Sequence, residues 1–374
     1  MRATRAVINV DYLQKNIEYI KTVTGAMLCM PVKADAYGHG ALPVARAALA
    51  SGADYLAVAT VGEGEELRNG KIDAPVLLLS IPLPGEIKAI IAANMEVFAA
   101  DEDYIDALQN SAAAEGATIA VHLKIDTGMG RIGCTPAQAP DLAQKISAGK
   151  NLGLAGCATH LAAADSLAAE DMAYTRMQLD AFTGAVEAIK ARGIDPGIVH
   201  AANTGGVTFY KDSWFTMVRP GILLYGYPPA SKSPLVDYAK IRPLMELKTN
   251  IVYVKTVKKG QSVSYGRTWT APADTRVGTL PVGYGDGLSR QLSNQWSVRV
   301  GDDPVLRPLV GRICMDQCMV DLGDDEARFG RWDEVTLFGG GAPHAGVMAG
   351  RINTIPYEIT CNINKRVPRV YKGV

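Results

Sequence analysis

Short apolar runs alternate with amphipathic stretches over residues 1–220. Eight of the runs have the length of buried strands: 27–32, 54–59, 75–80, 95–99, 118–125, 154–160, 198–202 and 215–218. Strands that alternate with helices in this way favour parallel βαβ units, and eight such units predict a closed (β/α)8 barrel of the TIM type. An open doubly wound sheet is the alternative, although no Gly-x-Gly-x-x-Gly motif follows the first strand.

Two of the amphipathic stretches are regular enough to predict helices. Over 11–23, three apolar residues share one face, and Asp11 is a candidate N-cap. Over 171–192, the apolar face is expected to carry Met177, Phe182, Val186 and Ile189. Both patterns have the spacing of helices that pack one side against a core.

The pattern changes after a proline-rich stretch that includes Pro228, Pro229 and Pro234. Helical spacing nearly vanishes there, and alternating segments follow at 247–257, 275–282, 297–300, 308–314, 317–322 and 334–338. We therefore predict an α/β chain with an N-terminal barrel over 8–234 and a C-terminal, mostly-β domain over 235–374. Residues 1–7 are candidates to join the second domain.

Composition narrows the function classes. Hydrophobic residues make up 48% and charged residues 20%, an ordinary globular balance. Lys plus Arg and Asp plus Glu are both 38, so the basic excess of a nucleic-acid binder is missing. No apolar run approaches the ~20 residues of a membrane span, and the start lacks a secretory pattern, so we expect a cytoplasmic protein. The six cysteines favour free thiols, and no Cys/His spacing predicts a metal site.

Residues suited to chemistry follow five of the eight runs, where a barrel enzyme carries its active site: Lys33, Arg131, His160, Asn203, Thr204, Arg219 and Gly221. Any one of these residues taken alone could have a purely structural role. His122 and His200, which are not in this set, are expected to be core or barrel-lining residues. Five polar positions on one rim point instead to a bound ligand, because burying them unpaired would cost several kcal/mol each.

The set suits pyridoxal 5′-phosphate. A desolvated lysine near other cations has a lowered pKa and forms a Schiff base with an aldehyde, which is a role for Lys33. The cofactor also needs a phosphate cradle and a partner for its ring nitrogen. Thr204, the Gly205–Gly206 turn and Gly221 offer donors to phosphate at the end of the barrel where such sites are common.

Here the chain resembles the bacterial alanine racemases. The resemblance rests on PVKADAYGHG, KIDTGMGRIG, HAAN, RPGILLYG, SYGRTW, LPVGYGDG, GRICMDQCMVD and IPYEI, which cover the whole chain in order. It implies a barrel followed by a β domain, and a homodimer with shared active sites. It also implies interconversion of L-alanine and D-alanine, which supplies D-alanine for cell-wall peptidoglycan.

The resemblance also implies roles for individual residues. Lys33 would hold the cofactor and act as one base, and Tyr265 of the partner chain would be the opposite base. Arg219 would face the ring nitrogen, with His160 beside the ring. Arg131 and Met315 would bind the substrate carboxylate. The remaining cofactor-binding or supporting residues would be Tyr37, Asn203, Thr204, Gly221, Ile222, Tyr357, Tyr284 and Asp316.

Two positions leave alternatives open. The family usually has serine where this chain has Thr204, and the added methyl group bears on its rotamer. Lys124 is a candidate for carbamylation, in which case it would hold Arg131 as an anion. The alternative for Lys124 is an ordinary lysine paired with an acid such as Asp126.

Other functions remain as alternatives. They are a racemase of serine or of broad specificity, a pyridoxal-phosphate decarboxylase of similar architecture, and a non-catalytic pyridoxal-phosphate-binding protein. The arginine at 219 disfavours the decarboxylase, which typically has an acidic residue there. Tyr265 and the C-terminal domain disfavour the non-catalytic protein.

Overall fold

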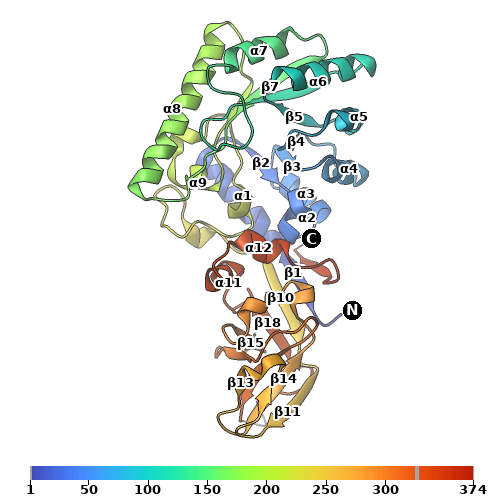
Figure 1. Ribbon diagram of the computed structural model, residues 1–374, viewed down its shortest axis with the longest axis vertical. Coiled ribbons are helices and arrows are strands. Elements are labelled where there is room, and N and C mark those ends of the chain that lie inside the picture. Colours follow the sequence, from blue (N-terminus) through green and yellow to red (C-terminus); the bar gives the residue numbers. More distant parts are fainter. Residues whose placement is uncertain (1, 325–327, 374) are drawn as a thin grey trace. The chain divides into compact units, whose positions relative to one another are not determined.

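The eight predicted strands form one parallel sheet in the computed structural model, which describes residues 2–324 and 328–373. They are β2 (Met27–Pro31), β3 (Tyr55–Val58), β4 (Val76–Leu78), β5 (Glu96–Ala99), β6 (Ile119–Lys124), β7 (Leu152–Ala158), β8 (Ile198–His200) and β9 (Met217–Val218). From β2 to β8 each strand pairs with the next along the chain, and β9 returns to pair with β2. The Thr216 N–H donates to the Val199 carbonyl and links β8 to β9, so the predicted barrel is confirmed (Figure 1).

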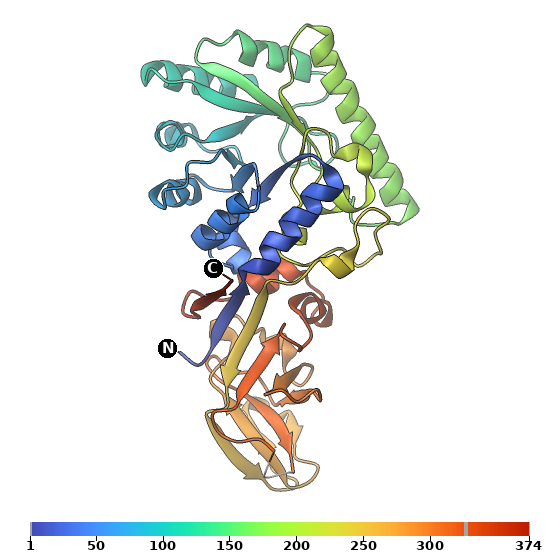
Figure 2. The ribbon, with the colours of Figure 1, turned by 180° about the vertical axis from the view of Figure 1, so that it is seen from behind.

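Helices lie around the outside of the strands (Figures 1 and 2). Those between successive strands and before the first one include α1 (Val10–Thr24), α3 (Ala41–Ala50), α4 (Val61–Asn69), α5 (Ile87–Ala92), α6 (Glu102–Ala114), α7 (Ala139–Ala148) and α8 (Ala169–Ala191). Three short helices begin directly after strands: α2 (Lys33–Gly38), α9 (Thr204–Phe209) and α10 (Gly221–Leu224). These short helices occupy the strand ends where the sequence predicts the site.

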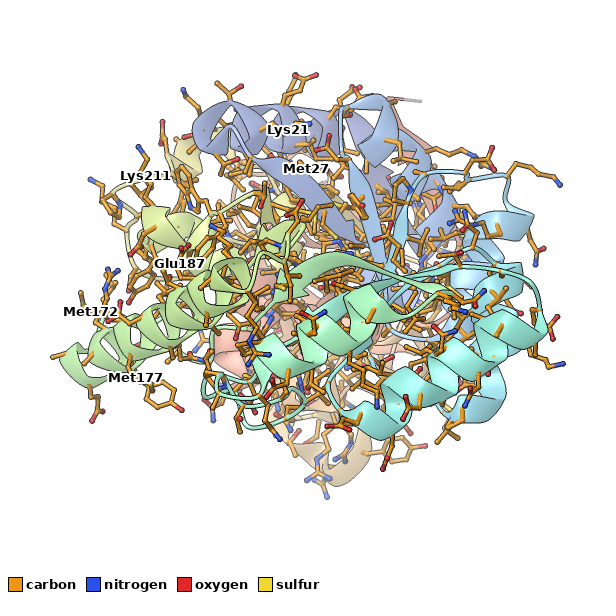
Figure 3. The ribbon with its side chains drawn as sticks, turned by 90° about the horizontal axis from the view of Figure 1, so that it is seen from above. Lys21, Met27, Met172, Met177, Glu187 and Lys211 are labelled. Atoms are coloured by element: carbon orange, nitrogen blue, oxygen red, sulfur yellow. The ribbon has the colours of Figure 1, made fainter. Side chains whose placement is uncertain are left out.

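Two details of the predicted helices were wrong. Asp11 lies inside the first turn of α1, and the side chain of Asn9 accepts the Tyr12 N–H at 3.2 Å instead. Met177 is 45% exposed, whereas Phe182 is fully buried. Five residues separate these two positions, which turns them about 140° apart on a helix. Figure 3 accordingly places Met177 on the outer side of α8.

The barrel interior combines small and large apolar side chains with several polar ones. Ala57 and Ala158 pack with Leu77, Phe98 and Met217 in one buried cluster. Strands β3 and β4 are buried along their whole length, as expected of parallel strands covered on both faces. His122 and His200 are fully buried, which confirms that they line the barrel.

The rest of the chain forms a nine-stranded, mostly antiparallel sheet in the order β11-β14-β17-β16-β15-β18-β10-β1-β19. Its strands are β1 (Arg5–Asn9), β10 (Met245–Asn250), β11 (Tyr253–Val257), β14 (Thr275–Leu280), β15 (Ser297–Val300), β16 (Arg307–Val310), β17 (Cys318–Gly323), β18 (Glu334–Phe338) and β19 (Arg369–Lys372). A small pair, β12 (Ser262–Val263) and β13 (Trp269–Thr270), and two helices, α11 (Ala345–Arg351) and α12 (Pro356–Cys361), complete this part. The predicted β domain is present, and the segment expected over 247–257 is split between β10 and β11.

Contacts divide the chain into two units. The barrel unit comprises Leu13–Ala36 and Ala41–Arg242. The β unit comprises the N-terminal residues up to Tyr12, the segment Tyr37–Gly40 and the chain from Pro243 onward. The boundary expected after residue 234 thus lies upstream of this division, and residues 8–12 cluster with the β unit. Among the described residues, no helix has the length and apolar character needed to cross a bilayer.

Candidate active site

Four cationic side chains surround His160 at the C-terminal end of the barrel strands. Burial lowers the pKa of His160 to about 2, and the charges of Arg219, Lys124, Arg131 and Lys33 contribute in that order. His160 is therefore neutral at any physiological pH. Three of the rim residues that the sequence singles out, Lys33, Arg131 and Arg219, thus lie within electrostatic range of a fourth, His160.

Arg219 is 6% exposed and is held by neutral groups. Its Nη1 donates to Nδ1 of His200 at 2.7 Å, and its Nη2 donates to the Thr159 carbonyl at 2.8 Å. Longer contacts of 3.3 Å join Nη2 to the His160 ring and to the Ala201 carbonyl. Burial lowers the pKa of Arg219 to about 10, so the guanidinium keeps its charge at neutral pH. In the described part of the chain, no carboxylate forms an ion pair with it.

Lys33 lies two residues after the end of β2, and the turn that follows it winds in the left-handed sense. The φ angles of Ala34, Asp35, Ala36 and Tyr37 are +52°, +53°, +51° and +51°. Residues with a β-carbon lose about 1–2 kcal/mol each in this conformation. Four in succession, directly beside a candidate cofactor lysine, make this a strained segment whose geometry other contacts must hold.

Two carboxylates hold the turn. Glu63 accepts the Ala34 N–H on one oxygen and the Ala59 N–H on the other, both at 2.7 Å. Asp35 accepts the N–H of Ala41 at 2.7 Å. These charge-assisted bonds offset part of the strain and fix the direction in which the chain leaves Lys33.

The helices α9 and α10 begin next to each other. The Thr204 hydroxyl donates to the Pro220 carbonyl at 2.9 Å and accepts the Leu223 N–H at 3.4 Å. Asn203 caps α9 by accepting the Gly206 N–H at 3.1 Å. The first-turn amides of a helix have no acceptor within the helix. Here the N–H groups of Gly206, Gly221 and Leu223 donate to neighbouring protein oxygens, and both helix starts lie at this place.

The glycine at position 205 follows from close packing. A β-carbon on Gly205 would lie 2.5 Å from the carbonyl carbon of Ala164, so alanine does not fit in this chain. The Asn203 amide also donates to the carbonyl of Leu161 at 2.9 Å. Both polar ends of Asn203 are thus used to hold loops in the described structure.

Lys124 ends β6 and is 4% exposed. Burial and the charges of Arg219 and Arg131 lower its pKa to about 7, although Asp126 opposes them. A substantial fraction of this lysine is therefore the neutral, nucleophilic amine near neutrality.

Arg131 lies on a loop that Asp126 organises. One oxygen of Asp126 accepts the N–H groups of Gly128 and Gly130, at 2.9 and 3.1 Å. Gly133 has φ +138°, and a β-carbon there would lie 2.4 Å from the Asp126 nitrogen. The glycines of the KIDTGMGRIG motif therefore fold the loop tightly and leave the Arg131 side chain exposed.

In the β unit, three predicted site residues are exposed. Tyr265 is 72%, Met315 53% and Tyr284 43% exposed. Ser264, directly before Tyr265, has φ +64° and ψ 178°, a region that residues other than glycine rarely occupy. Its hydroxyl donates to the Arg312 carbonyl at 2.6 Å. The backbone that carries Tyr265 is therefore held in a specific, strained shape.

An ion cluster supports Met315. Asp286 is fully buried and pairs with Arg2 at 2.6 Å and with Arg366 at 2.7 Å. Arg366 also pairs with Asp316 at 2.7 Å and contacts the Met315 carbonyl at 3.4 Å. The predicted residue Asp316 thus belongs to a network that fixes its own segment.

Tyr37 and Tyr357 form an edge-to-face pair in the β unit. Their ring centroids are 5.1 Å apart and the planes meet at 64°. Gly38 lies so close to α12 that a β-carbon would come within 2.1 Å of the Thr360 carbonyl oxygen. Two residues assigned to the same part of the cofactor site are therefore neighbours.

Sequence reasoning missed two parts of this arrangement. The left-handed turn has no glycine in its first four residues, so no residue preference marks it. Glu96 connects to Arg219 through His122 and His200, yet these residues lie on strands far apart in the sequence. The available signal was the presence of polar side chains at buried strand positions.

Comparison with known proteins gives one result over the whole chain. Family models described as the N-terminal and C-terminal domains of alanine racemase match residues 8–229 and 244–371. An alanine racemase of Treponema denticola is 47% identical over 99% of this chain and 98% of its own. The solved alanine racemase of Streptomyces coelicolor is 36% identical with a TM-score of 0.91, covering 100% of this chain and 98% of that one.

Proposed function

Because this chain belongs to the alanine racemase family, we propose that it interconverts L-alanine and D-alanine with pyridoxal 5′-phosphate bound through Lys33. The observation that carries the proposal is the grouping of Lys33, Lys124, Arg131 and Arg219 around a neutral His160. Arg219 is buried without a carboxylate partner in the described structure and Lys33 is half-buried, so an anionic ligand would stabilise the group.

The described residues fit the cofactor. Its aldehyde, ring nitrogen and phosphate need an amine, a charged donor and a set of amide donors. Lys33 follows β2, Arg219 follows β9, and α9 starts after β8, so the three requirements fall on adjacent strands. The residues that would hold the phosphate are Tyr37, Thr204, Gly221, Ile222 and Tyr357, with Asn203 as a further cofactor-binding residue.

When bound, the cofactor supplies an electron-accepting ring that makes the α-proton of the amino acid removable. Arg219 keeps its own proton and would donate to the ring nitrogen, which would therefore stay unprotonated. His160, being neutral, adds no second positive charge beside the ring. This arrangement moderates the electron demand of the ring and disfavours side reactions such as transamination.

Two bases on opposite faces perform the proton transfer. Lys33 removes or returns the proton on one face, and Tyr265 of the partner chain does so on the other. The exposure of Tyr265, Met315 and Tyr284 in a single chain supports a homodimer in which these side chains complete the other chain's site. A single rigid base could not readily serve both faces.

Arg131 and Met315 bind the substrate carboxylate, and Lys124 holds Arg131 in place as a carbamate. The neutral Lys124 amine attacks carbon dioxide, a nitrogen–carbon bond forms, and one proton leaves the nitrogen for solvent. The product is an anion that would accept hydrogen bonds from Arg131. The lowered pKa of Lys124, about 7, supports this chemistry because only the neutral amine reacts.

We place the product in the cytoplasmic supply of D-alanine for peptidoglycan. Expression of the chain in a bacterial strain that requires D-alanine should restore growth without the supplement. A coupled assay with L-alanine, D-alanine and L-serine would separate alanine racemisation from the serine alternative.

Labelling of Lys33 tests the cofactor assignment directly. After borohydride reduction of the cofactor-loaded protein, mass spectrometry should find the added mass on the peptide that contains Lys33. Lys33→Ala should carry none, whereas Lys150→Ala, a change at an exposed lysine, should label like the wild type. Label that persists in Lys33→Ala would disprove the assignment.

Subunit mixing tests the shared site. Lys33→Ala and Tyr265→Ala chains should each be inactive alone. A mixed dimer would have one site with both wild-type bases, so up to a quarter of wild-type activity per chain should return after subunit exchange. If exchange is verified by native mass spectrometry and activity does not return, the two bases do not belong to different chains.

A further inference from the structure

A continuous row of hydrogen bonds crosses the interior of the barrel. Nη1 of Arg219 lies 2.7 Å from Nδ1 of His200, and Nε2 of His200 lies 3.0 Å from Nδ1 of His122. Nε2 of His122 lies 2.7 Å from a carboxylate oxygen of Glu96. Both histidines are fully buried. The row therefore links the end of β9 to the start of β5 through the core.

The direction of every bond in this row can be derived. Arginine only donates, so Nδ1 of His200 must be an unprotonated acceptor. Burial and the charge of Arg219 hold the pKa of His200 well below its usual value, so His200 is neutral and its single proton is on Nε2. It donates that proton to Nδ1 of His122, which is therefore also unprotonated.

His122 is left with one proton, on Nε2, and donates it to Glu96. If His122 were instead the cation of an ion pair with Glu96, its Nδ1–H would face the Nε2–H of His200. Two donors at 3.0 Å cannot share a hydrogen bond. Only one direction of donation, from Arg219 towards Glu96, satisfies every hydrogen bond in the row. It requires an acceptor at position 96.

Glu96 differs from the histidines in its access to solvent. Its side chain is 18% exposed and lines a cavity of about 340 Å³ at the N-terminal ends of β4 to β7. The Tyr55 hydroxyl donates to its other oxygen at 3.3 Å. The one anion of the row is therefore placed where water lowers the cost of its charge.

We propose that Glu96 is a positioning residue for Arg219, acting through the fixed tautomers of His122 and His200. This rests on the proposed contact between Arg219 and the ring nitrogen of the cofactor. Glu96 keeps His200 in the tautomer that accepts from Arg219, and each polarised bond passes part of the carboxylate's field to the guanidinium. The orientation of Arg219 is thereby set from the opposite end of the barrel.

Nitrogen NMR of ¹⁵N-histidine-labelled protein, loaded with cofactor, reads the tautomers. The chain has five histidines, so the ring signals are few enough to assign. In the wild type, His122 and His200 should each show a proton on Nε2 alone. A doubly protonated His122, or a proton on Nδ1 of either ring, would overturn the proposal without any mutation.

Three variants then separate positioning from simple packing. Glu96→Leu removes the acceptor, and the single-tautomer pattern of both histidines should be lost. Glu96→Gln can still accept through its amide oxygen and should retain the pattern. Tyr55→Phe, the matched control, removes a bond to Glu96 outside the row and should change neither ring. An unchanged pattern in Glu96→Leu would contradict the proposal.

Kinetics and absorbance provide the functional readout. Glu96→Leu should lower kcat about fivefold, the effect of one lost hydrogen bond, with little change in KM, and should shift the absorbance of the bound cofactor. Glu96→Gln should recover most of both. The NMR result does not need the cofactor on Lys33, since Lys33→Ala should show the same tautomers. A failed borohydride test and a failed tautomer test are therefore distinguishable.

Discussion

Arg219 in the barrel unit and Asp286 in the β unit are both buried charged side chains, but their partners differ in charge. Arg219 contacts two histidines and two backbone carbonyls, all neutral. Asp286 contacts two arginines and the backbone N–H of Gly283. The first charge is left available to an anionic ligand, and the second is cancelled within the protein.

The hydrogen-bond row in the barrel and the ion cluster around Asp286 also differ in how far each tolerates the loss of one member. Each bond in the barrel row depends on the next, because one imidazole offers one donor and one acceptor. Asp286 keeps Arg2 if Arg366 is lost. We conclude that the barrel network is specialised for orientation, whereas the β-unit network is a support for the backbone around Met315. Substitutions in each network test this difference.

The largest expected effect concerns the charge of Lys124. Its pKa is about 7 in the folded protein and near 10.4 in the unfolded chain, so between these values the unfolded state binds more protons. Stability should therefore rise with pH from about 7 to 10. Relative to Lys124→Met, the gain should be about 3 to 5 kcal/mol at ~1.4 kcal/mol per pH unit, measured by urea unfolding in carbon-dioxide-free buffer.

Carbamylation would add to that stability. A carbamate forms on the folded protein and, like the neutral amine, binds fewer protons than the ammonium of the unfolded chain. The rise with pH should therefore persist in saturating bicarbonate, and the wild type should be more stable there than in carbon-dioxide-free buffer at the same pH. Lys124→Met should be insensitive to bicarbonate. If the wild-type and Lys124→Met curves run parallel and bicarbonate shifts neither, Lys124 neither carries the low pKa nor takes up carbon dioxide.

The next largest effect should come from breaking the barrel row in the middle. His200→Leu leaves Nη1 of Arg219 and Nδ1 of His122 without partners in the core. We expect a loss of about 2 to 3 kcal/mol in the free energy of unfolding, because two buried polar groups lose their bonds. The matched change in the β unit, Arg366→Met, should lose about 1 kcal/mol, since Arg2 still pairs with Asp286. Equal losses would remove the proposed difference in redundancy.

Low pH should reduce the stability that Asp286 contributes to the β unit. Burial alone would raise the pKa of Asp286, but hydrogen bonds from Arg2 and Arg366 outweigh it and the pKa is lowered. The stability this carboxylate contributes is therefore present above its unfolded pKa near ~3.9 and is lost as pH falls through the lower folded value. Asp286→Asn should lose about 1 to 2 kcal/mol at pH 7 and show a flatter decline below about pH 4. Identical acid slopes in both proteins would exclude this role.

The contrast between local and distant contacts also explains what could be predicted from the sequence. The barrel strands were predictable because each is a short apolar run, and the burial of Phe182, Val186 and Ile189 followed from helical spacing. The N-cap of α1 was wrongly assigned to Asp11. The side chain that accepts the first-turn N–H belongs to Asn9, which lies at the end of a strand. Met177 was also predicted to lie on the buried face of its helix, although it is turned about 140° from Phe182 around the helix axis.

The candidate site also contains residues that could be predicted from the sequence and residues that could not. Lys33, His160 and Arg219 were recognisable because each ends or directly follows an apolar run. Glu96 was not, because its importance depends on two histidines from other strands meeting in the core. Such pairings depend on strand order and register, which the apolar pattern does not specify.

The smallest effect concerns the left-handed turn after Lys33. Ala34 is exposed and has φ +52°, so removal of its β-carbon relieves strain without opening a cavity. We expect Ala34→Gly to raise the free energy of unfolding by about 0.5 to 1 kcal/mol. Ala188→Gly, at an exposed position of the right-handed helix α8, should lower it by about 0.5 to 1 kcal/mol. Urea unfolding of both variants measures whether each change raises or lowers the free energy of unfolding. A loss of stability in both would mean that the contacts of Glu63 and Asp35, rather than the β-carbon, dominate the energetics of the turn, and that the turn is not strained at Ala34.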